Sequence, residues 1–196
     1  MYSIKNNVEN AIEIKKSKFI TKLYKIDGID KVNSILEELN DEHRNATHIC
    51  FAYIIDGKEK CSDDGEPSGT AGIPILNILK KKNLTNILAV VIRYFGGIKL
   101  GAGGLVRAYS NSVVDSLKEA DIVELEEGYL IEAEFSYDQL KLIDYILTDK
   151  KIIEKTYNAN IIYKFYFNQS ELSFIPELEK AVIHISIKNK VLIEKD

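Results

Sequence analysis

The chain has 196 residues, a formal net charge of −4 at neutral pH and a hydrophobic content of 45%. This length and composition predict one large or two small globular domains and exclude a disordered or fibrous chain. No apolar run approaches the about eighteen residues of a membrane span, and the charged stretch up to Lys18 lacks a signal-peptide core. We therefore expect a cytoplasmic protein without membrane contact, and the acidic balance argues against broad, non-specific binding to polyanions.

The first half of the chain alternates between strand and helix patterns. Residues 19–25 and 48–55 predict strands, and Asp56-Gly57 predicts a hairpin turn into a strand at 58–61. Helices are expected around residues 32–39 and from Pro74, which suits a first helical turn. Residues 86–95 form a nearly continuous apolar run, which indicates a strand buried on both faces. A helix follows at about 104–120, with an apolar stripe of Val106, Tyr109, Val113, Leu117 and Ala120.

An acidic stretch that ends in Gly128 marks a change of composition. We expect a first domain at residues 1–127 and a second at 128–196. The second domain reads as strands at 129–135, 152–157, 160–167 and 182–187, with helices at 137–149 and 171–180. This βαββαβ order is that of the ferredoxin-like fold, so the predicted class is α+β. Tyr163, Phe165 and Phe167 alternate onto one strand face, which favours a core position over a base-stacking platform.

Most of the chain's eleven glycines lie in two segments. The basic segment, Arg93–Ser110, joins the buried strand to a helix start, where free amides and the helix dipole favour an anion. No acidic residue lies between Asn86 and Val114. The segment lacks the endings of nucleotide-binding glycine motifs. It therefore predicts either a structural loop or a phosphate-binding site made of Arg93, Lys99, Gly101, Gly103, Gly104, Arg107, Ser110 and Asn111.

The acidic loop, Ser62–Gly72, contains Asp63, Asp64, Glu66, Ser68 and Thr70. Clustered carboxylates can hold Mg²⁺ or act as acid and base, but the same residue types also form turns and helix caps. Cys50 and Cys61 lack a paired metal-ligand spacing, and the three histidines are scattered. We expect buried cysteines, structural or surface histidines, no metal and no cofactor.

These two segments, together with Ala46-Thr47-His48 before an aromatic strand, resemble the IMPACT family, in particular its bacterial, YigZ-like branch. The resemblance covers about residues 17–117. It implies a first domain similar to domain two of ribosomal protein S five and a second similar to a ferredoxin-like domain of elongation factor G. It also implies a link to translation, since eukaryotic members act in translational control. No catalytic residue is implied. Ala102 stands where a hydroxyl residue is common in the family.

We therefore expect a non-enzymatic binding protein whose basic segment contacts RNA or the ribosome. Two alternatives stay open. One is a Mg²⁺-dependent enzyme that acts on a phosphorylated small molecule or nucleotide, with the acidic loop as its metal site. The other is a protein–protein interaction module that uses the same surface. The oligomeric state is not predicted.

Overall fold

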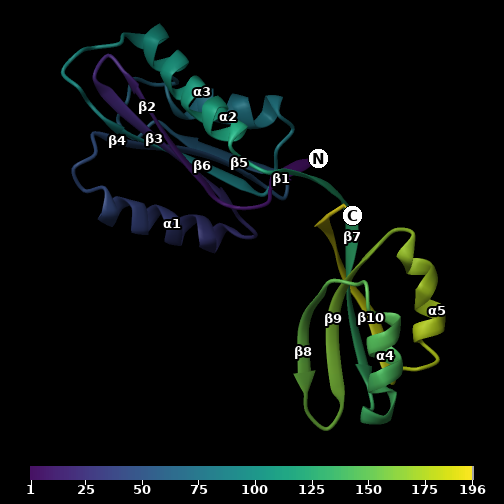
Figure 1. The fold of residues 1–196 in the computed structure, drawn as a ribbon. Coiled ribbons are helices and arrows are strands. Elements are labelled where there is room, and N and C mark those ends of the chain that lie inside the picture. Colours follow the sequence, from purple (N-terminus) through teal and green to yellow (C-terminus); the bar gives the residue numbers. More distant parts are fainter. Residues whose placement is uncertain (196) are drawn as a thin grey trace. The chain divides into compact units, whose positions relative to one another are not determined.

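The computed structural model describes residues 1–195, which form two compact units, Met1–Glu124 and the residues from Leu125 onward (Figure 1). Both units combine helices with an antiparallel sheet, which confirms the predicted α+β class. Within the described residues, no helix has both the length and the apolar character of a membrane span.

The first unit is a five-stranded antiparallel sheet with helices on both faces. Figure 1 shows α1 (Ile29–Glu42) on one face, and α2 (Gly72–Lys81) and α3 (Ala102–Lys118) together on the other. The strands follow the spatial order β2 (Val8–Ile14), β3 (Ser17–Lys25), β6 (Ile87–Tyr94), β4 (His48–Ile55) and β5 (Lys58–Ser62).

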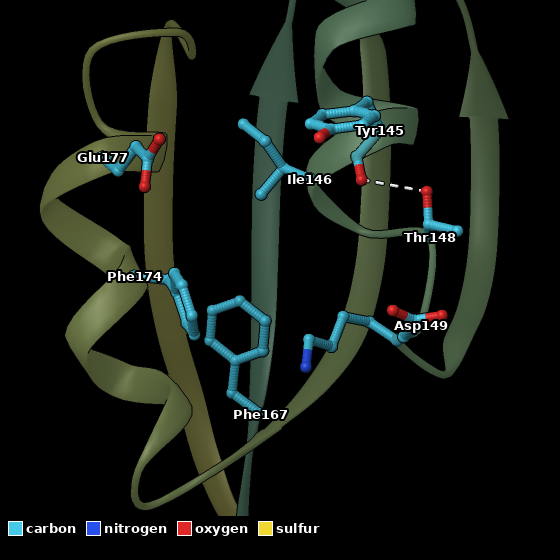
Figure 2. A pocket seen from close by; sticks show the side chains of 8 residues that line it. Tyr145, Ile146, Thr148, Asp149, Phe167, Phe174 and Glu177 are labelled. Atoms are coloured by element: carbon cyan, nitrogen blue, oxygen red, sulfur yellow. Dashed lines mark hydrogen bonds between the residues drawn. The ribbon is translucent and has the colours of Figure 1, made fainter.

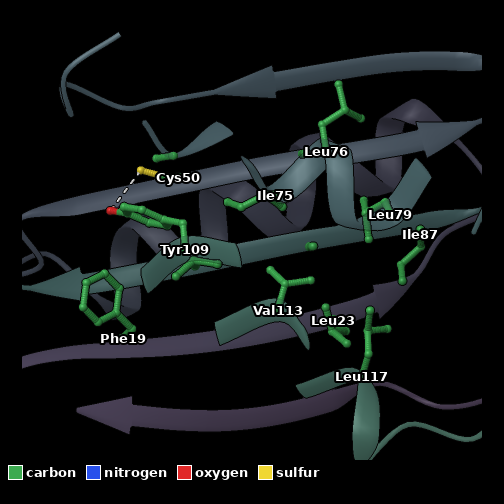
Figure 3. Packing of buried hydrophobic residues seen from close by; sticks show 14 of the residues in the cluster. Phe19, Leu23, Cys50, Ile75, Leu76, Leu79, Ile87, Tyr109, Val113 and Leu117 are labelled. Atoms are coloured by element: carbon green, nitrogen blue, oxygen red, sulfur yellow. Dashed lines mark hydrogen bonds between the residues drawn. The ribbon is translucent and has the colours of Figure 1, made fainter. Parts of the chain in front are cut away.

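The central strand β6 is buried on both faces, as its apolar run predicts. Successive strand residues point to opposite faces, so Leu88 and Val90 pack on the α1 side and Ala89 and Val91 on the α2 and α3 side. Figure 3 shows the second of these cores, where Tyr109 of α3 lies among the apolar side chains. Arg93 continues the series of Ala89 and Val91, so its side chain enters the same layer as Tyr109.

Two parts of the first unit differ from the sequence prediction. Strand β2 was not expected, because the N-terminal residues read as polar and charged. The buried face of α3 is also rotated from the predicted stripe. Val106 is 37% exposed, while Leu105, Ala108 and Ser112 are buried. Ser112 is a polar member of this face, and its hydroxyl is hydrogen-bonded to the buried hydroxyl of Thr21, which the apolar pattern does not reveal.

The second unit has the ferredoxin-like topology that the element order predicts. Its strands lie side by side in the antiparallel order β10 (His184–Glu194), β7 (Ile122–Phe135), β9 (Ile161–Asn168) and β8 (Ile152–Tyr157). The first three residues of β7, Ile122–Glu124, belong to the first unit, where they pair with β1 (Tyr2–Ile4). The helical segments are shorter than expected: η1 (Tyr137–Gln139), α4 (Leu140–Ile146), η2 (Glu171–Phe174) and α5 (Ile175–Leu178).

The aromatic residues of β9 belong to the core of this unit. Tyr163 and Phe165 are fully buried and Phe167 is 1% exposed, and they pack with Ile143 and Leu178 of the helices. This arrangement places the rings in the core of the unit, as their alternation along the strand predicts.

Candidate functional site

Asp63 holds the acidic loop together from within. Its carboxylate accepts backbone hydrogen bonds from Gly69 at 2.8 Å, Ala71 at 3.0 Å and Gly72 at 2.8 Å. Burial by itself raises the pKa of Asp63, but the three amides outweigh burial and the pKa is lowered. Asp63 therefore stays ionised at neutral pH, and its carboxylate is occupied by hydrogen bonds from the loop backbone.

The other side chains of the acidic loop also have local partners. Asp64 Oδ2 accepts the backbone amide of Ile49 at 2.5 Å, and the Thr70 hydroxyl donates to the Pro67 carbonyl at 2.6 Å. Ser68 is exposed. Across the described residues, no cluster of three or more His, Cys, Asp or Glu side chains is arranged to hold a metal ion. The acidic loop thus has the geometry of a turn that is tied to strand β4.

Glu66 forms a buried ion pair with Arg93. Glu66 Oε1 lies 2.5 Å from Arg93 Nη1 and accepts the Tyr109 hydroxyl at 2.8 Å, and both charged side chains are at most 6% exposed. The guanidinium carbon of Arg93 also lies 5.4 Å from the ring centroids of Phe19 and Phe95. This pair joins the acidic loop to the basic segment, two sites that the sequence analysis treats separately.

The placement of Arg93 changes what it can contribute to a phosphate site. Arg93 is 5% exposed, and its guanidinium group donates hydrogen bonds to Glu66 and to the hydroxyl of Ser17. Its Nε has no hydrogen-bond partner among the described residues. A phosphate on the surface cannot replace these partners without breaking a buried ion pair. Arg93 therefore contributes to the structure around the site through its contacts with Glu66 and Ser17.

The loop of the basic segment is shaped by two glycines. A Cβ at Gly96 would lie 1.9 Å from the Lys16 carbonyl oxygen, so no larger residue fits there. Gly101, with φ of 74°, precedes α3 in a left-handed conformation that favours glycine. The backbones of Gly96 and Lys16 therefore approach each other closely.

The start of α3 is open to solvent. No side chain of residues 1–195 caps it, and its first turn contains no acidic residue. A Cβ at Gly103 would meet nothing within 4 Å, so the fold gives no steric reason for glycine there. Lys99 and Arg107 are exposed around this start. Among the other predicted residues, Gly101 and Asn111 are exposed, while Gly104 and Ser110 are half-buried.

A pocket of about 400 Å³ lies where the two segments meet. Its ionisable lining residues are His48, Glu66, Arg93 and Lys99, and Gly101 and Ala102 at the start of α3 line it as well. Its remaining walls are Thr47, Pro67, Phe95, Leu100 and Leu105.

His48 is the pocket residue that the sequence analysis assigned to a structural or surface role. It opens β4, and its Nδ1 lies 2.7 Å from the Asp64 carbonyl oxygen, while Nε2 lies 3.8 Å from Glu66 Oε2. Its neighbours in the sequence give no catalytic or metal-binding spacing, so only the fold reveals its contact with Glu66.

Cys50 lies under the same site but has no role as a nucleophile. It is fully buried, its thiol donates to the Asp63 carbonyl at 3.0 Å, and burial raises its pKa to about 12. Its sulfur also lies 3.4 Å from the Tyr109 hydroxyl (Figure 3). The expectation of a buried cysteine is confirmed for Cys50, whereas Cys61 is half-buried.

The second unit has a pocket of its own, of about 390 Å³ (Figure 2). Phe167 and Phe174 form its apolar side, and Tyr145 at its rim is 79% exposed. The ammonium group of Lys150 is paired with Glu171, so its charge is already neutralised. Asp149 and Glu177 add two carboxylates to the lining of this pocket.

Comparison with known proteins agrees with this architecture of a first unit that contains a glycine-rich site and a second, ferredoxin-like unit. Residues 15–117 match the Impact N-terminal domain family. The chain is 37% identical to the IMPACT family member YvyE of Bacillus subtilis, over 94% of this chain and 96% of YvyE. It is 40% identical to the IMPACT family member YigZ of Escherichia coli, over 78% of each chain.

A crystal structure of a hypothetical protein is 32% identical to this chain, with a TM-score of 0.70 over 96% of this chain and 97% of the other. These matches cover both units. The chain belongs to the IMPACT family, which confirms the resemblance inferred from the two glycine-rich segments.

Proposed function

We propose that this protein is a translation-linked binding protein that holds an RNA phosphate backbone at the open start of α3. The observation that carries the proposal is the uncapped first turn of α3, with Lys99 and Arg107 exposed beside it. Free amides and the helix dipole attract an anion there, and two exposed cations add attraction that falls as salt rises.

The electrostatics of the segment support this placement. The chain as a whole is acidic, but no acidic residue occurs between Asn86 and Val114. Glu66, the carboxylate in the lining of the pocket, is neutralised by Arg93 in the buried pair. Lys99 and Arg107 therefore act as the local positive charges, in place of the predicted trio that included Arg93.

Gly103 gives a second line of support. Glycine within a helix costs about 1 kcal/mol relative to alanine, and no neighbouring atom would touch a Cβ at this position. A bare backbone at the first helical turn allows a phosphate oxygen to approach the amides closely. Membership of a family whose eukaryotic members act in translational control points to RNA or the ribosome as the source of that phosphate.

The test is a salt series of binding to a single-stranded RNA oligonucleotide and to purified ribosomes. Replacing Lys99 and Arg107 by alanine should weaken RNA binding and reduce the slope of log affinity against log salt by about 1.4, the value for two lost phosphate contacts. The matched control replaces Lys81 and Lys118, which are exposed on α2 and α3 away from the segment.

Equal salt slopes in the two double variants would overturn the proposal. Ribosome binding that survives in the Lys99 and Arg107 variant, with no dependence on salt, would show a protein contact instead. Both outcomes are informative because neither substitution removes a buried partner.

A further inference from the structure

We propose that the pocket between the acidic loop and the basic segment binds a small phosphorylated molecule that carries hydroxyl groups, such as a pentose phosphate or a nucleotide. His48 and Glu66 would accept hydrogen bonds from its hydroxyls, and Lys99 with the first amides of α3 would hold its phosphate. This site goes beyond the contact with an RNA backbone, because it uses the interior of the pocket.

The protonation of His48 follows from its partner. A backbone carbonyl can only accept, so the Nδ1 that lies 2.7 Å from the Asp64 carbonyl carries the proton. In the neutral ring, Nε2 then presents a lone pair. The contact with Asp64 also fixes the ring, which lets Nε2 act as an oriented acceptor in the pocket wall.

Glu66 presents a second acceptor beside it. Its Oε1 is occupied by Arg93 and Tyr109, whereas Oε2 has no hydrogen bond within the described residues. The distance from Oε2 to His48 Nε2 is 3.8 Å, too long for a hydrogen bond. The Glu66 side chain is only 3% exposed, so this acceptor is largely withdrawn from bulk water. A donor that contacts both atoms is the group that such a pair recognises.

Lys99 and the start of α3 supply the part of the lining that suits an anion. Lys99 is the cation of the pocket that has no ion pair among the described residues, since Arg93 is engaged by Glu66. Gly101 and Ala102 contribute the start of α3 to the same lining. One part of the lining thus favours an anion and another part favours donors, and Phe95 and Leu100 add apolar contacts.

The size of the pocket agrees with this class of ligand. A volume of about 400 Å³ falls within the range of roughly 300–1,000 Å³ that is typical of small-molecule sites. An inorganic anion would leave the His48 and Glu66 acceptors unsatisfied, and a neutral sugar would leave Lys99 unpaired. A phosphorylated polyol satisfies both walls at once.

The experiment follows the imidazole signals of the full-length protein by NMR while ribose 5-phosphate or adenosine 5′-monophosphate is added. We expect saturable shifts of the His48 ring signals and unchanged signals of His184, which is exposed in the second unit. The variant His48→Asn retains a donor for the Asp64 carbonyl but lacks Nε2, and its affinity should fall about tenfold. His184→Asn is the matched control.

The proposal is overturned if neither probe shifts the His48 signals, if His48→Asn binds as tightly as the wild type, or if inorganic phosphate binds as tightly as ribose 5-phosphate. The same His48→Asn protein is then assayed with RNA. If this variant still binds RNA in a salt-dependent way, the small-molecule site and the proposed RNA contact are distinct. The reason is that the RNA contact depends on Lys99 and Arg107 and makes no use of His48 Nε2.

Discussion

The acidic loop and the basic segment are both rich in glycine, yet they distribute their polar groups in opposite ways. In the acidic loop, the carboxylates of Asp63 and Asp64 accept backbone amides within the fold. In the basic segment, the first amides of α3 have no side-chain cap, and Lys99 is exposed. The comparison teaches that satisfied polar groups build the scaffold, whereas the open ones are available to a ligand.

The largest effect should come from breaking the pair that joins the two segments. Arg93→Met leaves the Glu66 carboxylate buried without its cation, and we expect the first unit to lose about 3–5 kcal/mol of unfolding free energy. Denaturant unfolding measures the loss of unfolding free energy, and hydrogen exchange of the β6 amides provides a second measurement of it. Lys99→Met, the control at the surface, should change stability by no more than about 0.5 kcal/mol. Similar losses in both variants would show that Arg93 has no special structural role.

Gly96→Ala should have the next largest effect. The added methyl group would meet the Lys16 carbonyl at 1.9 Å, and moving that backbone should cost about 3 kcal/mol. The same substitution at Gly103, where the methyl group meets nothing, is the matched control for thermal unfolding. A Gly96→Ala protein as stable as the wild type would contradict the close approach of the two backbones.

Asp63→Asn tests how the acidic loop is held. Since the folded-state pKa of Asp63 is lowered, its ionised form stabilises the fold above the ordinary value of 3.8, and the contribution is lost as the pH falls through the lower folded value. At neutral pH the variant should be less stable by about 1–2 kcal/mol. In acid the two proteins should converge. Urea midpoints across this range measure the difference, and a constant difference at every pH would contradict the assignment.

The smallest effect on stability should come from Gly103→Ala, and it should have the opposite sign. Alanine in the first turn of α3 should raise stability by up to about 1 kcal/mol, because glycine is the poorer helix former. The same variant should bind RNA more weakly, because its methyl group lies in front of the open amides. The melting temperature and the RNA affinity of one preparation of the variant measure these two effects. Unchanged RNA affinity would show that Gly103 does not contact the RNA.

The parts of the fold that were predictable are those with an uninterrupted signal. Residues 86–95 predict β6 because their nearly continuous apolar run is typical of a strand buried on both faces. The order of strands and helices after it predicts the ferredoxin-like unit. Strand β2 was missed although Val8, Ile12 and Ile14 alternate with polar residues. The rotation of α3 was missed because buried Ser112 and Ser116 interrupt its apolar face, and hydrogen bonds satisfy both hydroxyls.

The candidate site was predictable in its segments but not in its pairings. The sequence marks Arg93 as a cation near glycines, yet its buried strand also requires a counter-charge, since arginine is almost never fully buried without one. That requirement does not say which carboxylate pairs with it, and Glu66 lies 27 positions earlier in the chain. His48 approaches Glu66 only because β4 is paired with β6.

The two oxygens of Glu66 have a consequence for genetic screens. Substitutions of Glu66 other than Gln remove the Oε1 contacts with Arg93 and Tyr109, and Gln removes the charge that pairs with Arg93, so a variant scan that reads cellular growth will score this position largely through protein abundance. Such a scan cannot reveal what Oε2 does in the pocket. His48, whose contact with Asp64 survives in His48→Asn, is the position at which selection for function can be read separately from selection for folding.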